Sequence, residues 1–126
     1  MRTFFLGGLG AVVVEDSMEY FSQGHWTALK AKLPVPLFGH CHVKINETTI
    51  MIIGGKTTNN DILNKTWYFN LIDQTFTNGP GLNYPRYYHG CTYDPDAALV
   101  IVFGGSSINN NAETLTLNGH NWNFGD

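Results

Sequence analysis

Charged side chains are scarce in this sequence. Lysine and arginine together number 7 and aspartate and glutamate 10, which is 13% of the 126 residues, and the formal net charge is −3. No short window holds more than two basic residues, so the chain lacks the basic surface that attracts nucleic acid or an anionic membrane. No apolar run approaches the roughly 18 residues of a membrane span. We therefore expect neither a nucleic-acid partner nor a membrane-embedded protein.

Cysteine is almost as rare, with only Cys41 and Cys91 in the chain. Neither belongs to a Cys-x-x-Cys pair. His40 and His42 could complete a tetrahedral metal site with Cys91 or His89, but the ligand spacing of known zinc motifs is missing. We favour hydrogen-bonding roles for His40 and His89. The "GGSS" segment also lacks the pattern of a serine nucleophile. The sequence predicts no enzyme, no metal and no cofactor.

Glycine and asparagine are abundant instead, with 14 glycines and 13 asparagines by count. Both residues favour turns. Helix signals are weak, since "TALKAKL" is the only candidate and is too short to form a stable helix alone. Together with an apolar fraction of 43%, this composition predicts an ordered all-β domain rich in turns.

An apolar run that ends in two glycines occurs three times, as "TFFLGG", "TIMIIGG" and "LVIVFGG". The glycine pairs begin at Gly7, Gly54 and Gly104, which are 47 and 50 residues apart, and Cys41 and Cys91 keep the step of 50. Self-similarity at this period indicates a stacked supersecondary unit. Turn residues divide each period into short strands. We predict strands at 38–45, 49–54, 65–71 and 75–77, then at 87–94, 98–104, 112–117 and 120–123, preceded by three around 3–7, 17–21 and 25–28.

These features resemble the kelch repeat. The resemblance rests on the run before the double glycine, the aromatic residues of "EYF" and "WYF" on the third strand, and tryptophan on the fourth. The stretch from Arg86 to His89 completes it. The preceding copy departs from the pattern, with Pro36 in the place of Arg86 and its histidine displaced by one position, to His40. The following copy has no aromatic residue in "ETLTL".

The resemblance implies a single domain of β-propeller blades, each with four antiparallel strands. The implied units are a partial blade at 1–35 and blades at 36–85 and 86–126. Closed propellers typically have 4–8 blades, so eleven strands imply an incomplete arc. We expect a fragment of a longer protein, and self-association of copies is the alternative.

The resemblance also implies a protein-interaction or scaffold module that binds a protein partner through the loops between strands. Exposed loops on rigid strands are the usual place for binding residues. The candidate contacts are Lys56, Asn60, Asp61, Arg86 and Asn110. The guanidinium of Arg86 can pair with a carboxylate, although it can equally anchor its own turn. The alternatives are a fragment of a galactose-oxidase-like propeller enzyme, suggested by Tyr87, Tyr88 and His89, and a purely structural fragment.

The cellular compartment stays open. We expect Cys41 and Cys91 to be small buried thiols, because equivalent strands of adjacent blades lie farther apart than the roughly 4.4–6.8 Å between Cα atoms that a disulfide needs. Free thiols favour a reducing compartment. A secreted protein is the alternative, since "MRTFFLGGLGAVVV" resembles a secretory signal, and the sequons that start at Asn46 and Asn64 lie on predicted turns.

Overall fold

A computed structural model gives the architecture of the chain. It describes residues 2–6, 18–22, 25–29, 32–35, 37–105, 112–117, 119 and 121–124. Within these residues the regular structure consists of β-strands without a helix, so the predicted all-β class is confirmed. Accordingly, the described part contains no helix of the length and apolarity that crossing a membrane requires.

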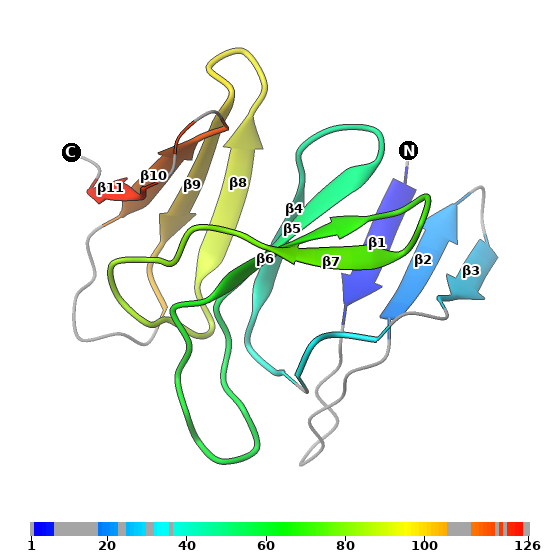
Figure 1. Ribbon diagram of the computed structural model, residues 1–126, viewed down its shortest axis with the longest axis horizontal. Coiled ribbons are helices and arrows are strands. Elements are labelled where there is room, and N and C mark those ends of the chain that lie inside the picture. Colours follow the sequence, from blue (N-terminus) through cyan, green and yellow to red (C-terminus); the bar gives the residue numbers. More distant parts are fainter. Residues whose placement is uncertain are drawn as a thin grey trace.

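The strands form three antiparallel sheets, and within each sheet every strand pairs with its neighbours in the sequence (Figure 1). The first sheet contains β1 (Arg2–Leu6), β2 (Met18–Ser22) and β3 (His25–Ala28). The second, which we call the central sheet, contains β4 (Cys41–Lys44), β5 (Thr49–Ile53), β6 (Thr66–Asn70) and β7 (Thr75–Asn78). The third, the C-terminal sheet, contains β8 (Gly90–Asp94), β9 (Leu99–Phe103), β10 (Glu113–Thr116) and β11 (Asn123–Phe124).

Every strand that the sequence predicted is present, but β4, β8 and β11 begin three residues later than expected, and β11 shares only Asn123 with the predicted range 120–123. The residues before β4 form a separate bridge instead. The amide of Phe38 donates to the carbonyl of Lys56 at 3.1 Å, and the amide of Lys56 donates to the carbonyl of Phe38 at 2.9 Å. The entry to β4 is therefore tied to the loop that follows β5.

Strand β5 is buried on both faces, which explains its continuous apolar sequence. Ile50 and Ile52 are fully buried in one cluster, together with Leu33, Leu37, Trp67 and Phe69. Met51 and Ile53 alternate with them and face the other side. This alternation makes the central sheet the core layer of the described structure.

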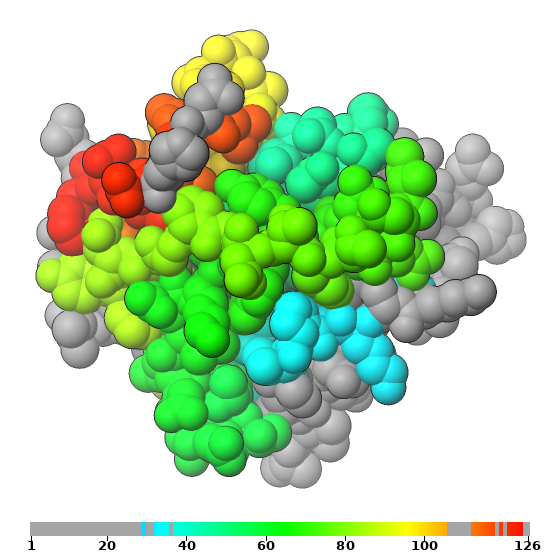
Figure 2. Space-filling model, in the orientation of Figure 1, coloured from blue at the N-terminus to red at the C-terminus, as the bar shows by residue number. Residues whose placement is uncertain are grey.

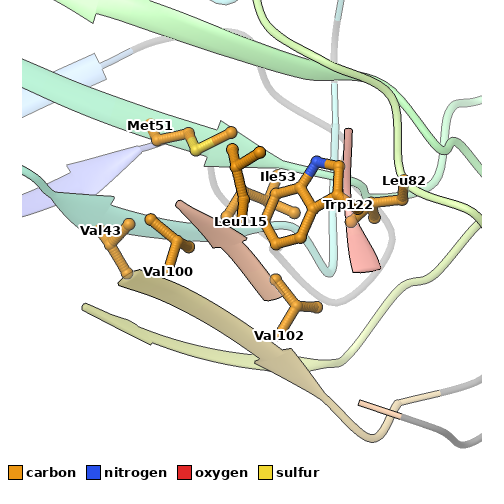
Figure 3. Packing of buried hydrophobic residues seen from close by; sticks show 8 residues of the cluster. All are labelled: Val43, Met51, Ile53, Leu82, Val100, Val102, Leu115 and Trp122. Carbon is orange, nitrogen blue, oxygen red and sulfur yellow. The ribbon is translucent and has the colours of Figure 1, made fainter. Parts of the chain in front are cut away.

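The second cluster joins the central sheet to the C-terminal sheet (Figure 3). Its members are Val43, Met51 and Ile53 from the central sheet, Val100, Val102, Leu115 and Trp122 from the C-terminal part, and Leu82 from the connection between them. All of these side chains are at least nine-tenths buried. Complete burial of a side chain of this size contributes about 1.5–3 kcal/mol, so this cluster is a main source of attraction between the two sheets.

The central sheet and the C-terminal sheet differ in the length of the turn that follows their first strand. A hydrogen bond from Ile45 to Thr49 closes a turn of three residues, 46–48, between β4 and β5. The turn between β8 and β9 has four residues, 95–98, because Asp94 pairs with Leu99. The additional residue shifts the pairing of β8 by one position relative to that of β4.

This shift brings the two cysteines together. Cys41 pairs with Ile53, whereas Cys91 pairs with Val102 rather than with Phe103, the counterpart of Ile53 in the repeat. A shift of one residue turns a side chain to the opposite face of its sheet. The structure joins Cys41 to Cys91 in a disulfide, with their Cα atoms 6.2 Å apart. The prediction of two free, buried thiols is therefore wrong.

Candidate functional site

The loop between β5 and β6 places three of the predicted contact residues, Lys56, Asn60 and Asp61. It is held by its own hydrogen bonds: the amide of Thr57 donates to the carbonyl of Asp61 at 3.0 Å, and the amide of Asn60 donates to the carbonyl of Thr57 at 3.0 Å. Asn60 and Asp61 are exposed. The loop projects beyond the sheets at the lower edge of the molecule (Figures 1 and 2). It therefore presents polar groups on a fixed backbone.

Three aromatic rings surround the base of this loop. The ring centroids of Phe38 and Tyr87 are 6.4 Å apart, those of Phe38 and Tyr88 are 6.1 Å apart, and those of Tyr87 and Tyr88 are 5.1 Å apart. The ammonium of Lys56 lies 4.8 Å from the centroid of Tyr87 and 6.0 Å from that of Phe38. We call these four residues the aromatic surface.

The backbone explains how these rings meet. Phe38 and Tyr87 occupy the same position in the two copies, because each lies two residues before the histidine that precedes β4 or β8. The next position is Gly39 in one copy, with φ of 66°, and Tyr88 in the other, with φ of 54°. A left-handed conformation is costly for a bulky residue. The fold holds Tyr88 there with a 2.7 Å hydrogen bond from its amide to the carbonyl of Gly39.

Tyr88 is also one of the most exposed large apolar side chains of the described residues, at 56%. A bulky residue in a left-handed conformation whose ring faces solvent costs stability without adding to the core. Strain of this kind concentrates at functional sites. The sequence analysis considered Tyr87 and Tyr88 only for the enzyme alternative and did not name Phe38 as a contact, although aromatic residues precede the histidine in both "LFGH" and "RYYH".

The charge of Lys56 is available to a ligand. Among the described residues, the ion pairs are Lys44 with Glu47 at 3.7 Å and Arg86 with Glu113 at 3.1 Å. Neither involves Lys56, whose ammonium is held by rings rather than by a carboxylate. A cation over an aromatic face keeps its hydrogen-bond donors. The aromatic surface therefore combines flat apolar groups with one positive charge.

The structure removes Arg86 from the candidate contacts. Its side chain is fully buried, with Nε 3.1 Å from Oε2 of Glu113 and Nη1 donating to the carbonyl of Gly104 at 3.1 Å. Its backbone also bonds to the loop between β5 and β6, since its amide donates to the carbonyl of Leu63 and its carbonyl accepts from the amide of Gly55. Arg86 therefore anchors the turn between the two sheets, which was the alternative interpretation of this residue.

Glu113 is the buried partner that sequence reasoning missed. Its Oε1 accepts from the amide of Asn83 at 2.6 Å, and its Oε2 lies 3.4 Å from the amide of Tyr84 in addition to its contact with Arg86. Asn83 extends the network by donating to the carbonyl of Trp122 at 2.9 Å. Buried charges need such compensation, and the network fixes the segment that leads into Tyr87 and Tyr88.

His89 lies beneath this region. Its Nε2 is 2.9 Å from the carbonyl of Ile53, and its Nδ1 has no hydrogen-bond partner among the described residues. Burial lowers the pKa of His89 below the ordinary value of 6.5; the hydrogen bond to the carbonyl of Ile53 opposes this effect in part, and the charge of Arg86 adds a smaller lowering. Desolvation disfavours the charged imidazolium.

The residues that suggested a metal do not form one site. Cys91 is committed to its disulfide, and the ring of His89 contacts the carbonyl of Ile53. Tyr88 faces solvent. Across the part of the chain that the structure describes, no group of three or more histidine, cysteine, aspartate and glutamate side chains is arranged to hold a metal ion. The remaining candidate contact, Asn110, lies outside the described residues.

Comparisons with known proteins give no further guidance. No protein-family model matches the chain, and no curated protein matches it. Function must therefore be argued from the aromatic surface and the adjoining loop.

Proposed function

We propose that this chain forms kelch-like propeller blades and serves as a protein-interaction module, with the aromatic surface and the loop at 56–61 as its contact area. Support for the blades comes from two antiparallel four-stranded sheets packed face to face in sequence order. Their first strands, β4 and β8, are cross-linked by the disulfide. Support for binding comes from the site itself.

The observation that carries the proposal is the convergence of three rings and an ammonium that has no carboxylate partner among the described residues. Tyrosine and phenylalanine supply large contact area at low entropic cost and are enriched in protein interfaces. Lys56 adds a charge that selects for an anionic group, while the exposed Asn60 and Asp61 offer polar contacts at the rim. The partner that fits is a protein segment with a carboxylate next to an apolar or aromatic side chain.

A random-peptide library displayed on phage tests this proposal directly. The immobilised chain should select peptides in which aspartate or glutamate adjoins an apolar residue. Tyr88→Ala should weaken the binding of these peptides by about 2 kcal/mol, which is roughly 30-fold, and Lys56→Glu should abolish their selection. Lys44→Glu is the matched control, because Lys44 lies at the end of β4 farther from the aromatic surface and already pairs with Glu47.

The control should bind as the unmodified chain does. Equal binding by the Tyr88→Ala and Lys56→Glu variants would show that the peptides bind elsewhere and would refute the site. Urea unfolding of each variant establishes that a loss of binding does not reflect a loss of fold.

A further inference from the structure

The turn between β4 and β5 has the chemistry of an acceptor for an N-linked glycan. It carries the sequon Asn46-Glu47-Thr48, in which Asn46 and Glu47 are exposed. The Oδ1 atom of Asn46 accepts two hydrogen bonds from Thr48, at 2.9 Å from the amide and at 3.1 Å from the hydroxyl. The acceptor nitrogen, Nδ2 of Asn46, makes no hydrogen bond to any described residue.

The second sequon, Asn64-Lys65-Thr66, differs because the fold uses both of its functional groups. Nδ2 of Asn64 donates to the carbonyl of Leu82 at 3.3 Å. The hydroxyl of Thr66 donates to the carbonyl of Pro80 at 2.8 Å, and Thr66 is only 2% exposed. Asn64 is exposed, but in the folded chain its amide is engaged in a hydrogen bond and the hydroxyl of Thr66 is buried, so the sequon does not offer a transferase both groups.

The disulfide is an independent observation that points to the same compartment. Structural disulfides persist in oxidising environments such as the secretory pathway and are rare in the cytosol. The bond between Cys41 and Cys91 closes across the two sheets, and Cys41 lies on the strand that leads to Asn46. Asparagine-linked glycosylation takes place in that pathway.

We propose that Asn46 is an N-glycosylation site and that Asn64 is not. In the transfer, Nδ2 of Asn46 forms a bond to the anomeric carbon of an oligosaccharide carried on a lipid pyrophosphate. The bond between that carbon and the pyrophosphate oxygen breaks, the lipid pyrophosphate leaves with the electron pair, and Nδ2 loses one proton to a base of the transferase. No oxidant or reductant takes part.

The position of the glycan is compatible with the proposed binding site. The turn of Asn46 and the loop of Lys56 lie at opposite ends of the central sheet (Figure 1), separated by the length of β4 and β5. A glycan at Asn46 therefore leaves the aromatic surface open. Asn64, in contrast, follows Leu63, whose amide donates to the carbonyl of Gly55 at the base of the Lys56 loop.

The test is the mass of the whole chain secreted from cultured eukaryotic cells behind a cleavable leader. Enzymatic release of the glycan in heavy-oxygen water marks the modified asparagine as aspartate. We expect one glycan, marked at Asn46. Asn46→Gln and Thr48→Ala should abolish it, Thr48→Ser should retain it, and the matched Asn64→Gln variant should keep it.

Secreted chain without a glycan at Asn46 would overturn the proposal, and so would a glycan that is lost in Asn64→Gln. The readout is independent of peptide binding, so its failure leaves the aromatic surface untouched. The unmodified and Asn46→Gln chains should also bind the selected peptides equally.

Discussion

Replacing Glu113 by glutamine tests the buried network that holds the two sheets together. The substitution keeps the shape of the side chain and removes its negative charge. In the unmodified chain, the carboxylate of Glu113 receives hydrogen bonds from Arg86, Asn83 and Tyr84, and both charged side chains are fully buried. With glutamine in its place, the guanidinium of Arg86 stays buried without a counter-charge. The side-chain NH2 of the glutamine then faces some of the hydrogen-bond donors that the carboxylate accepted from.

The magnitude follows from that geometry. Removing one partner of a buried ion pair typically costs about 3–5 kcal/mol, because the other charge remains desolvated. A domain of this size has a total stability of about 5–15 kcal/mol. Glu113→Gln should therefore remove a large fraction of the free energy of unfolding and lower the urea midpoint in proportion. In the Arg86→Met background, the same substitution should cost about 2 kcal/mol less, since no buried cation is then left unpaired.

The unmodified chain, Glu113→Gln, Arg86→Met and the double variant form a double-mutant cycle. Equilibrium urea unfolding, followed by circular dichroism, measures the stability of all four proteins. The control is Glu47→Gln, because Glu47 pairs with Lys44 at 3.7 Å with a side chain that is 91% exposed. A surface pair of this kind is worth at most about 1 kcal/mol. If Glu113→Gln destabilised the chain no more than Glu47→Gln does, the buried pair would not hold the sheets together.

Three further predictions concern the disulfide, a histidine and the glycine pair. Cys41→Ser opens a link between residues 50 positions apart and should cost about 4 kcal/mol of unfolding free energy; an unchanged urea midpoint under non-reducing conditions would mean that the thiols are not joined. Because the pKa of His89 is lowered by folding, its contribution to stability is full above pH 6.5 and is lost as the pH falls below that value. The decline between pH 7.5 and 5.5 should be shallower in His89→Gln, and identical slopes would contradict the assignment. A Cβ at Gly105 would lie 2.6 Å from the carbonyl of Tyr87, whereas one at Gly104 meets nothing within 4 Å, and both residues have positive φ. Gly105→Ala should therefore destabilise by clearly more than the roughly 1–2 kcal/mol expected for Gly104→Ala, and equal costs would argue against the close approach.

The sheets were predictable from local pattern alone. Strands β5 and β9 are apolar runs bounded by turn residues, and the repeat predicted that each would pair with the strands before and after it in the sequence. The late start of β4 and β8 was not predictable, because the residues before these strands pair with the loop after β5 through tertiary contacts. Periodicity identifies elements, and packing decides where each one begins.

The candidate site was predicted only in part. Lys56, Asn60 and Asp61 were predicted as contacts because polar residues follow a buried strand, and the structure places all three in the loop between β5 and β6. Arg86 was misassigned because its partner, Glu113, lies 27 residues away on a strand with no sequence signal that links the two. A buried charge and an exposed charge look alike in a sequence, since burial depends on the neighbours that the fold supplies.

Both the disulfide and the aromatic surface depend on one additional residue in a turn. Aligning the repeat by its cysteines equates Phe38 with Tyr88, whereas the strand pairing equates Phe38 with Tyr87. The offset turns Cys91 toward Cys41, and it also places a tyrosine where the other copy has Gly39. Since the side-chain period of a strand is two, a shift of one residue is the smallest change that exchanges the faces of a strand. The length of the turn, more than the repeat itself, therefore decides which side chains of the two sheets meet.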